Sequence, residues 1–219
     1  MKLHPHILRL ARQEVDQHLA DDLRYAVMLH RFLHDGLDRN DYLDAAYGFK
    51  QFLNDYGVGR TLQAGDTAKL KILKVIREFP FHGSPVEIIM ELAHVLQKKK
   101  LSSGTAASGP GLPRSFASKL LYVYRPDQVI PFDSYVRKSL EVRTGQKLTD
   151  LSDYFHEAEA FRQTHFAEHK SEVQRARRKY ESHILPLLST TVFDPDRMLS
   201  WKFTDKYLWC EEYARRNSV

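Results

Sequence analysis

Apolar side chains recur every three or four residues along nearly the whole chain, and this spacing constrains the fold more than any other feature of the sequence. Such spacing places the apolar residues on one face of an α-helix. No run of four to eight residues shows the strict alternation of a half-buried strand. We therefore expect an all-α protein, and the usual helix length of about 10–14 residues predicts nine to eleven helices. Turn signals separate the periodic stretches at Asp35-Gly36, Gly57 to Gly59, Gly65-Asp66, Pro80 to Pro85 and Pro126. Asn40, Asp66 and Ser84 precede periodic stretches and are predicted to be N-caps.

The composition limits what such a helical chain can be. Its 219 residues correspond to one domain or two small lobes. Hydrophobic residues make up 42% of the chain, which is enough for a packed core and excludes a disordered tail. The most apolar stretch, residues 86–96, is interrupted by charged residues, whereas a membrane span needs about 18 apolar residues. No secretion signal is evident, and one cysteine excludes a disulfide framework, so we expect a cytoplasmic protein without a membrane partner.

Positive charge is concentrated in one part of the chain. The formal net charge is +5, and residues 97–126 contain basic residues but no acidic one. This segment includes 101–113 (LSSGTAASGPGLP), a stretch rich in Gly, Ser and Pro. Loop amides and lysines can both bind phosphate oxygens, so the segment favours contact with nucleic acid. A plain surface loop is the alternative interpretation.

A single carboxylate follows in residues 130–138, which read IPFDSYVRK. Pro131 disfavours helix at the residue before it, and Val136 begins an apolar stripe, so a helix is expected to start directly after Asp133. Asp133 is therefore predicted to be an N-cap that accepts backbone N–H groups near the positive end of the helix. Most aspartates in such positions only cap, so the local pattern leaves a structural and a functional role open.

The chain from the Gly-rich stretch through this aspartate resembles the helix–hairpin–helix DNA glycosylases. In that superfamily a Gly-rich hairpin joins two helices, and a capped Asp follows the start of the second helix at the distance that separates Ser115 from Asp133 here. The sequence looks most like compact bacterial relatives of the 8-oxoguanine glycosylase fold, some of which act in phage defence. The close match covers residues 109–140. The motifs that carry it are Ser108-Gly-Pro-Gly-Leu-Pro-Arg-Ser-Phe-Ala-Ser-Lys-Leu-Leu120, Arg125-Pro126 and Ile130-Pro-Phe-Asp-Ser-Tyr-Val-Arg-Lys138.

The resemblance implies an all-α, helix–hairpin–helix glycosylase-like fold with two helical lobes and a DNA-binding cleft between them. Residues 1–219 would form a single glycosylase-like unit, in which the first helix and the C-terminal helices make one lobe and the middle helices the other. The hairpin and active-site region would span about 98–140, and the C-terminal helical part about 141–219. The partner would be double-stranded DNA, and we expect a monomer that needs no cofactor.

The implied reaction hydrolyses the N-glycosidic bond of a flipped-out base. Asp133 is the candidate catalytic residue, because a fixed carboxylate would stabilise positive charge on the deoxyribose and orient the attacking water. Bifunctional members carry a lysine near the start of the second helix, where this chain has Arg114 and Ser115. The nearest lysine, Lys119, lies a turn further on, which favours a monofunctional enzyme. Lys119 as a displaced Schiff-base nucleophile is the alternative.

The hairpin amides and the basic side chains nearby would bind the phosphates beside the flipped base. The hairpin departs from the family's usual Leu-Pro-Gly-Val-Gly pattern. The residues assigned to DNA binding are Lys98, Lys99, Lys100, Gly109, Gly111, Arg114, Ser115 and Arg137. Candidates for the base pocket or for a wedge in the duplex are Phe81, His82, Phe132, Trp201 and Trp209. Large rings mostly serve packing, so a place in the core is the alternative for the aromatic candidates.

Three other signals are interpreted structurally. The string GVGRT at 57–61 resembles the family's hairpin pattern, but no capped Asp follows it at a suitable distance, so we interpret it as a loop. His165-Phe-Ala-Glu-His169 matches a zinc-binding pattern, but no third ligand is evident and we expect no metal. Cys210 has no evident His partner and is interpreted as inert.

Two functions besides a glycosylase stay open. One is a non-catalytic helix–hairpin–helix DNA-binding protein, in which Asp133 only caps its helix. The other is a helical interaction protein without a nucleic-acid role. The base that a glycosylase would remove is also open between an oxidised purine and a modified cytosine, such as the glucosylated hydroxymethylcytosine of some phages.

Overall fold

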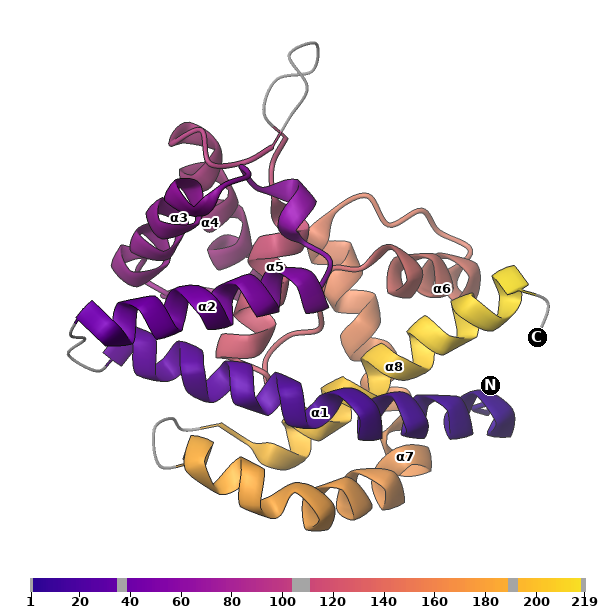
Figure 1. Ribbon diagram of the computed structural model, residues 1–219. Coiled ribbons are helices and arrows are strands. Elements are labelled where there is room, and N and C mark those ends of the chain that lie inside the picture. Colours follow the sequence, from indigo (N-terminus) through magenta and orange to yellow (C-terminus); the bar gives the residue numbers. More distant parts are fainter. Residues whose placement is uncertain (1, 35–38, 104–110, 189–192, 218–219) are drawn as a thin grey trace. The chain divides into compact units, whose positions relative to one another are not determined.

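The computed structural model describes residues 2–34, 39–103, 111–188 and 193–217 (Figure 1). Within these ranges the chain forms eight α-helices, one turn of 3-10 helix and no strand, which confirms the predicted all-α class. The elements are α1 (Pro5–His34), α2 (Arg39–Asp55), η1 (Gly59–Thr61), α3 (Asp66–Glu78), α4 (Pro85–Lys98), α5 (Arg114–Tyr124), α6 (Ser134–Thr144), α7 (Leu151–Leu188) and α8 (Pro195–Asn217).

The expected number of nine to eleven helices is wrong, because two of the helices are much longer than average. α1 has 30 residues and α7 has 38. No glycine and no internal proline interrupts α1, so nothing in its sequence ends the helix early. α7 changes direction at Tyr180, whose φ of −110° and ψ of 16° are not helical.

Local capping residues set where two of the helices begin. Ser84 caps α4 as predicted: its side chain accepts the N–H of Glu87, and the Glu87 carboxylate accepts the N–H of Ser84 at 2.8 Å. This reciprocal pair is a capping box. The predicted N-cap at Asp66 is wrong by one residue. Gly65, with φ of 96°, precedes α3, and Asp66 is its first helical residue.

The chain divides into two compact units. Unit 1 consists of Met1–Arg24 and Arg125–Val219, and unit 2 consists of Tyr25–Tyr124. α1 therefore contributes its first part to unit 1 and its last part to unit 2. Within unit 2, α3 and α4 lie side by side, and α4 also packs against α5 (Figure 1).

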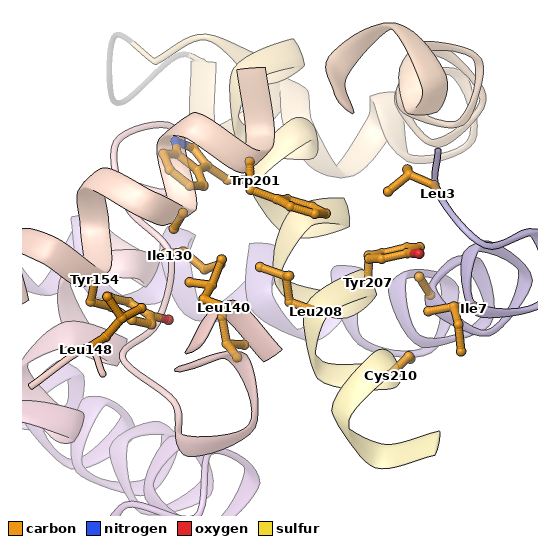
Figure 2. Close-up of a cluster of buried hydrophobic side chains, with 14 of the residues drawn as sticks. Leu3, Ile7, Ile130, Leu140, Leu148, Tyr154, Trp201, Tyr207, Leu208 and Cys210 are labelled. Carbon is orange, nitrogen blue, oxygen red and sulfur yellow. The ribbon is translucent and has the colours of Figure 1, made fainter. Parts of the chain in front are cut away.

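α8 is the central helix of unit 1. It packs against both α6 and α7, and its residues 198–205 are buried without a break. A helix that is buried on every side must also bury whatever polar side chains its sequence contains. Figure 2 shows its apolar side chains among those of the surrounding elements. The cluster includes Ile7 of α1, Ile130, Leu140 of α6, Tyr154 of α7, and Trp201, Tyr207, Leu208 and Cys210 of α8.

A buried ion pair joins α8 to α1. Lys202 is 2% exposed, and its ammonium group donates to the carboxylate of Asp22. Burial lowers the pKa of Lys202, and the negative charge of Asp22 opposes this shift. Removing one partner of such a pair leaves an uncompensated charge in the interior. The contact between α1 and α8 therefore depends on both side chains.

The substitution Asp22→Asn is expected to lower the free energy of unfolding by roughly 3 kcal/mol, because Lys202 loses its counter-charge. Urea unfolding followed by circular dichroism measures the change. The neighbouring variant Asp21→Asn is the control: Asp21 is exposed and pairs with Arg24 at 3.3 Å. We expect a change within about 0.5 kcal/mol for this surface pair. Equal destabilisation of the two variants would contradict the role of the buried pair.

Candidate functional site

Asp133 ends the extended segment that leads into α6. Its backbone has φ of −119° and ψ of 145°, and its Oδ1 accepts the N–H of Tyr135 at 2.8 Å. Its carbonyl oxygen accepts the N–H of Arg137 at 3.0 Å, which begins the helical hydrogen-bond pattern. These contacts confirm the predicted N-cap. Asp133 is half-buried, so its carboxylate is fixed in position while part of the residue reaches solvent.

The backbone just before Asp133 is anchored from the core of unit 1. The hydroxyl of buried Tyr154 donates to the carbonyl oxygen of Pro131 at 2.5 Å. The ring of Phe132 meets the ring of Tyr154 edge to face at 5.0 Å. Burial raises the pKa of Tyr154 well above its usual value, and the charges of Asp205 and Asp133 raise it further. Tyr154 therefore stays a neutral hydrogen-bond donor at ordinary pH.

Asp205 of α8 is a second carboxyl group whose charge acts on this region. It is buried, and its Oδ2 lies 3.9 Å from Nζ of Lys206. Burial raises the pKa of Asp205, the positive charges of Lys206 and Lys202 oppose this shift, and the charge of Asp133 adds to it. The sequence interpretation missed Asp205. The signal that points to it is an acidic residue inserted in the run WKFTDKYLW, residues 201–209, which is too aromatic for a solvated helix face.

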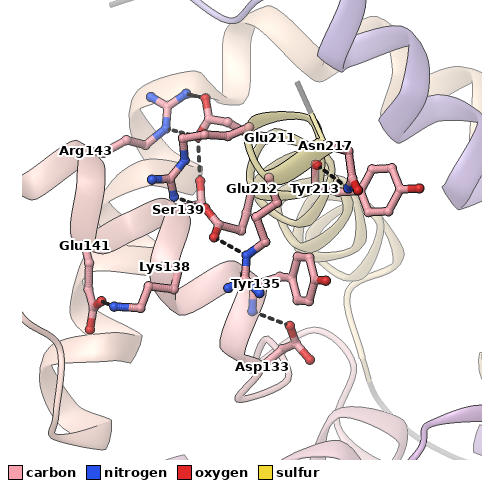
Figure 3. Close-up of polar contacts among 12 residues, drawn as sticks. Asp133, Tyr135, Lys138, Ser139, Glu141, Arg143, Glu211, Glu212, Tyr213 and Asn217 are labelled. Atoms are coloured by element: carbon pink, nitrogen blue, oxygen red, sulfur yellow. Dashed lines mark hydrogen bonds and ion pairs between the residues drawn. The ribbon is translucent and has the colours of Figure 1, made fainter. Parts of the chain in front are cut away.

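A bidentate ion pair fixes α6 against α8 (Figure 3). The guanidinium group of Arg143 donates to Glu211 through Nε at 2.7 Å and through a terminal nitrogen at 2.5 Å. Ser139 donates to the same carboxylate at 2.5 Å. Parallel hydrogen bonds of this kind restrict both distance and orientation. The helix that Asp133 caps is thereby held in place on α8.

Arg137, which was assigned to DNA binding, lies one turn after Asp133 in α6. Its guanidinium carbon is 5.8 Å from the centroid of the Phe132 ring, and its Nε is 3.9 Å from a carboxylate oxygen of Glu141. Both Arg137 and Phe132 are half-buried. Contact of these two residues with DNA or with a base stays a prediction.

Trp209 lies beside the first turn of α6. Its ring stacks on Tyr135 at 5.3 Å and on Tyr213 at 5.1 Å. The N–H of Tyr135 binds the Asp133 carboxylate, so Trp209 and Asp133 share a neighbour. The structure thus brings one predicted aromatic candidate to the region of the predicted catalytic residue.

The remaining candidates are Trp201 in unit 1 and Phe81 and His82 in unit 2. Trp201 is buried in unit 1, with the guanidinium carbon of Arg162 at 5.1 Å from its ring. Phe81 is buried in unit 2, where its ring centroid lies 4.5 Å from that of Tyr124. His82 is exposed, next to a glycine with φ of 110°. A part in base recognition stays a prediction for each of them.

The three lysines at 98–100 lie at the end of α4 and are exposed. The chain leaves the helix through Lys100, which has a φ of 55°. The N–H of Lys100 bonds to the carbonyl of Gln97, and the N–H of Leu101 to the carbonyl of Leu96, both at 2.9 Å. This pair of bonds is a Schellman motif, with lysine where glycine is usual. The motif turns the chain toward the Gly-rich segment.

The string GVGRT at 57–61 is a loop with one 3-10 turn, and it contacts the base of the Gly-rich segment. The N–H of Ser103 donates to the carbonyl of Thr61 at 3.0 Å, and the N–H of Gln63 donates to that of Leu101 at 2.9 Å. Gly111 is exposed, and its N–H donates to the carbonyl of Ser103 at 3.3 Å. Gly109 lies outside the described residues.

Arg114 and Ser115 are the first two residues of α5, and both are half-buried. Lys119 follows one turn later. Its Nζ donates to the carbonyl oxygen of Tyr56 at 2.8 Å. Lys119 belongs to unit 2 and Asp133 to unit 1. Lys119 therefore supports the turn after α2 in its own unit.

The two histidines of the His-x-x-Glu-His pattern make separate polar contacts. His165 Nδ1 lies 2.8 Å from a carboxylate oxygen of Glu168, and His169 Nε2 lies 3.2 Å from Oγ of Ser200. In the part of the chain that the structure describes, no group of three or more His, Cys, Asp or Glu side chains could hold a metal ion. Burial, together with the charges of His165 and Arg162, lowers the pKa of His169 to about 4. His169 is therefore a neutral contact between α7 and α8.

Because the pKa of His169 is about 4 in the folded protein and about 6.5 in the unfolded chain, acid favours unfolding. Below pH 6.5 the unfolded chain takes up a proton that the folded state does not accept until about pH 4. The contribution of His169 should therefore fall by roughly 2 kcal/mol between pH 7 and pH 5. Urea unfolding at the two pH values measures this decrease, which His169→Gln should remove. The exposed residue His183 provides the control, since His183→Gln should keep the pH dependence.

Two further features bear on the class of protein. Cys210 is buried, and burial raises the pKa of its thiol to about 12, so the reactive thiolate is scarce at neutral pH. None of the helices in the described ranges combines the length and the apolar character that a membrane crossing requires.

Comparison with known proteins identifies no relative: no family model, no curated protein and no solved structure matches this chain. What the protein does must therefore be inferred from its own residues.

Proposed function

We propose that this chain is a monofunctional DNA N-glycosylase of the helix–hairpin–helix type. It would hydrolyse the bond between deoxyribose and a base flipped out of double-stranded DNA and leave an abasic site. The observation that carries the proposal is the half-buried carboxylate of Asp133, held by the N–H of Tyr135 at the start of α6. The substrate is either an oxidised purine, in base excision, or a modified cytosine of phage DNA, in defence.

A carboxylate fixed in this way suits the chemistry of base removal. Breaking an N-glycosidic bond builds positive charge on the deoxyribose. A preorganised anion beside that charge stabilises the transition state more than water does, because it does not have to reorient. The same carboxylate can accept a proton from the attacking water. Both roles use a carboxylate at the N-terminus of α6, where the backbone dipole of the helix attracts negative charge.

The organisation of the chain supports the same function. Residues 1–24 and 125–219 form one unit and residues 25–124 form the other. The glycosylase resemblance implies two lobes with the first and the C-terminal helices in one of them, although here the end of α1 belongs to the other unit. Unit 2 carries the exposed lysines at 98–100, and unit 1 carries Asp133. Basic side chains bind the DNA backbone, and a base must leave the stack before its glycosidic bond can be reached.

The place of Lys119 supports hydrolysis without a lyase step. A Schiff-base nucleophile attacks through an amine lone pair that must point at C1′ of the sugar. Nζ of Lys119 instead donates to the carbonyl oxygen of Tyr56 at 2.8 Å. We therefore assign Lys119 a structural role in the turn after α2.

A non-catalytic DNA-binding protein is the second candidate function. The observation that favours it is that Asp133 already has a complete structural role, because it caps α6 through the N–H of Tyr135. The two candidates differ in whether the negative charge of this residue is needed.

The substitution Asp133→Asn separates the two candidates. Asparagine caps helices as well as aspartate does, so folding and DNA binding should be unchanged. Base release should fall at least about 100-fold if the charge stabilises the transition state. The assay uses DNAs with 8-oxoguanine, uracil, alkylated bases or glucosylated hydroxymethylcytosine, and detects abasic sites as strand breaks after alkali.

Asp150→Asn is the matched control. Asp150 lies just before α7 in the same unit, and its Oδ1 accepts the N–H of Ser152 at 2.6 Å. This variant should keep full base release. If Asp133→Asn released a base as fast as the wild type does from the same DNA, the catalytic role of Asp133 would be overturned. DNA strand breaks that form without alkali would show lyase activity and overturn the monofunctional assignment. They would support Lys119 as the Schiff-base nucleophile.

The lysines at 98–100 are expected to bind DNA phosphates without regard to sequence. Changing all three lysines to Gln should weaken binding to every duplex. The slope of log affinity against log salt concentration should also decrease, by about 0.9 for each phosphate that the variant no longer neutralises. Fluorescence anisotropy at several salt concentrations measures the slope. Lys71 and Lys74 are exposed on α3 of the same unit, and their change to Gln is the control. An unchanged slope in the triple variant would exclude these lysines from the interface.

A further inference from the structure

Three aromatic rings form a continuous stack on unit 1. The ring of Trp209 in α8 stacks both on that of Tyr135 in α6 and on that of Tyr213 in α8. The ring planes are nearly parallel, with angles of 23° and 12° and centroid distances of 5.3 Å and 5.1 Å. Trp209 and Tyr213 are four residues apart, which places them on the same face of α8.

The stack is open to solvent, unlike the other large rings of α8. Tyr213 is 44% exposed, and Trp209 and Tyr135 are half-buried. On the same helix Trp201 and Tyr207 are each 2% exposed. Core packing accounts for the buried rings but does not explain an ordered stack that ends at the surface. An exposed aromatic ring offers a π-face on which another planar group can stack.

Two cationic side chains lie against the rings of the stack, and each also pairs with a carboxylate, Arg216 with Glu212 and Lys206 with Asp205. The guanidinium carbon of Arg216 lies 4.3 Å from the centroid of the Tyr135 ring, and Nζ of Lys206 lies 6.0 Å from that of the Trp209 ring. The carboxylate of Glu212 is buried, where it pairs with Arg216 and Arg215. Figure 3 shows Glu212, Tyr213 and Tyr135 on this part of unit 1.

These charges decide which ligand suits the rings. Arg216 and Lys206 already make the cation–π contacts that a cationic ligand would make with Tyr135 and Trp209. A planar group that carries a phosphate is favoured, because its π-face stacks on the rings while its phosphate lies near the cations. An unpaired nucleobase in a DNA strand has this chemistry.

We propose that Tyr135, Trp209 and Tyr213 form a stacking platform for an unpaired nucleobase of DNA. The inference rests on the proposed function only for the choice of DNA as the partner. Tyr135 lies two residues after Asp133, so the platform adjoins the capped carboxylate. The base comes either from a single strand or from a duplex in which one base is extruded, and the experiment separates these sources.

Binding of fluorescein-labelled DNA to Tyr213→Ala tests the platform. The probes are an oligothymidine single strand, a fully paired duplex and the same duplex with one bulged base. Affinity for the single strand and for the bulged duplex should fall about 10-fold, because one base loses its stacking partner. Affinity for the paired duplex should stay within about twofold, since its bases already stack on each other. A decrease limited to one unpaired probe identifies the source of the base.

Two variants control for the ring and for the surface. Tyr213→Phe keeps the ring and should bind every probe as the wild type does. Tyr47 is 66% exposed on α2, and Tyr47→Ala should leave binding unchanged. The variant Trp201→Phe leaves Trp209 as the sole tryptophan, and its fluorescence should be quenched by the unpaired probes. If Trp201→Phe does not fold, anisotropy with the Tyr213 variants decides the question.

The outcomes separate the platform from the proposed function. Normal binding of both unpaired probes by Tyr213→Ala would overturn the platform, while base release that depends on Asp133 would still support the glycosylase. Equal weakening on the paired and unpaired probes would also overturn it, because stacking on an unpaired base would not be involved. Absence of DNA binding by the wild type at low salt would overturn both.

Discussion

The burial of residues 198–205 of α8 on all sides is the constraint on which unit 1 depends. Residues 198–205 are enclosed by other elements, so the charged groups among them must find partners inside the protein. Lys202 does so with Asp22 of α1. Further along α8, Glu211 pairs with Arg143 of α6. α1 and α6 are therefore attached to the central helix by charge pairs as well as by apolar contacts.

The same attachment determines the surroundings of Asp133. The carboxylate is held by the first turn of α6, and α6 is held on α8 by Glu211. The carbonyl of Pro131, just before the cap, is held by Tyr154 from the core. Asp205 adds a buried charge to the environment of Tyr154. A single helix thus influences both the position and the electrostatic surroundings of the candidate catalytic group.

How far the sequence predicts these features depends on how local their causes are. The all-α class, the cap at Ser84 and the cap at Asp133 follow from a few neighbouring residues, and the structure confirms them. The number of helices does not follow from a few neighbouring residues, because the lengths of α1 and α7 depend on packing along the whole of each helix. The pair Asp22–Lys202 joins residues 180 positions apart, and no periodic pattern identifies such a partner. Stacking of Tyr135 on Trp209 is equally non-local.

Under the proposed function, the capping role of Asp133 would prepare its carboxylate for catalysis and would not compete with it. A carboxylate on a free loop would have to be ordered and desolvated as charge develops on the sugar, and this would raise the barrier. A carboxylate that already accepts the N–H of Tyr135 was ordered when α6 formed, at a cost met during folding. A cap that needs only a hydrogen-bond acceptor is equally served by asparagine, serine or threonine. The full negative charge of Asp133 exceeds what capping requires, and base removal is a reaction that would use it.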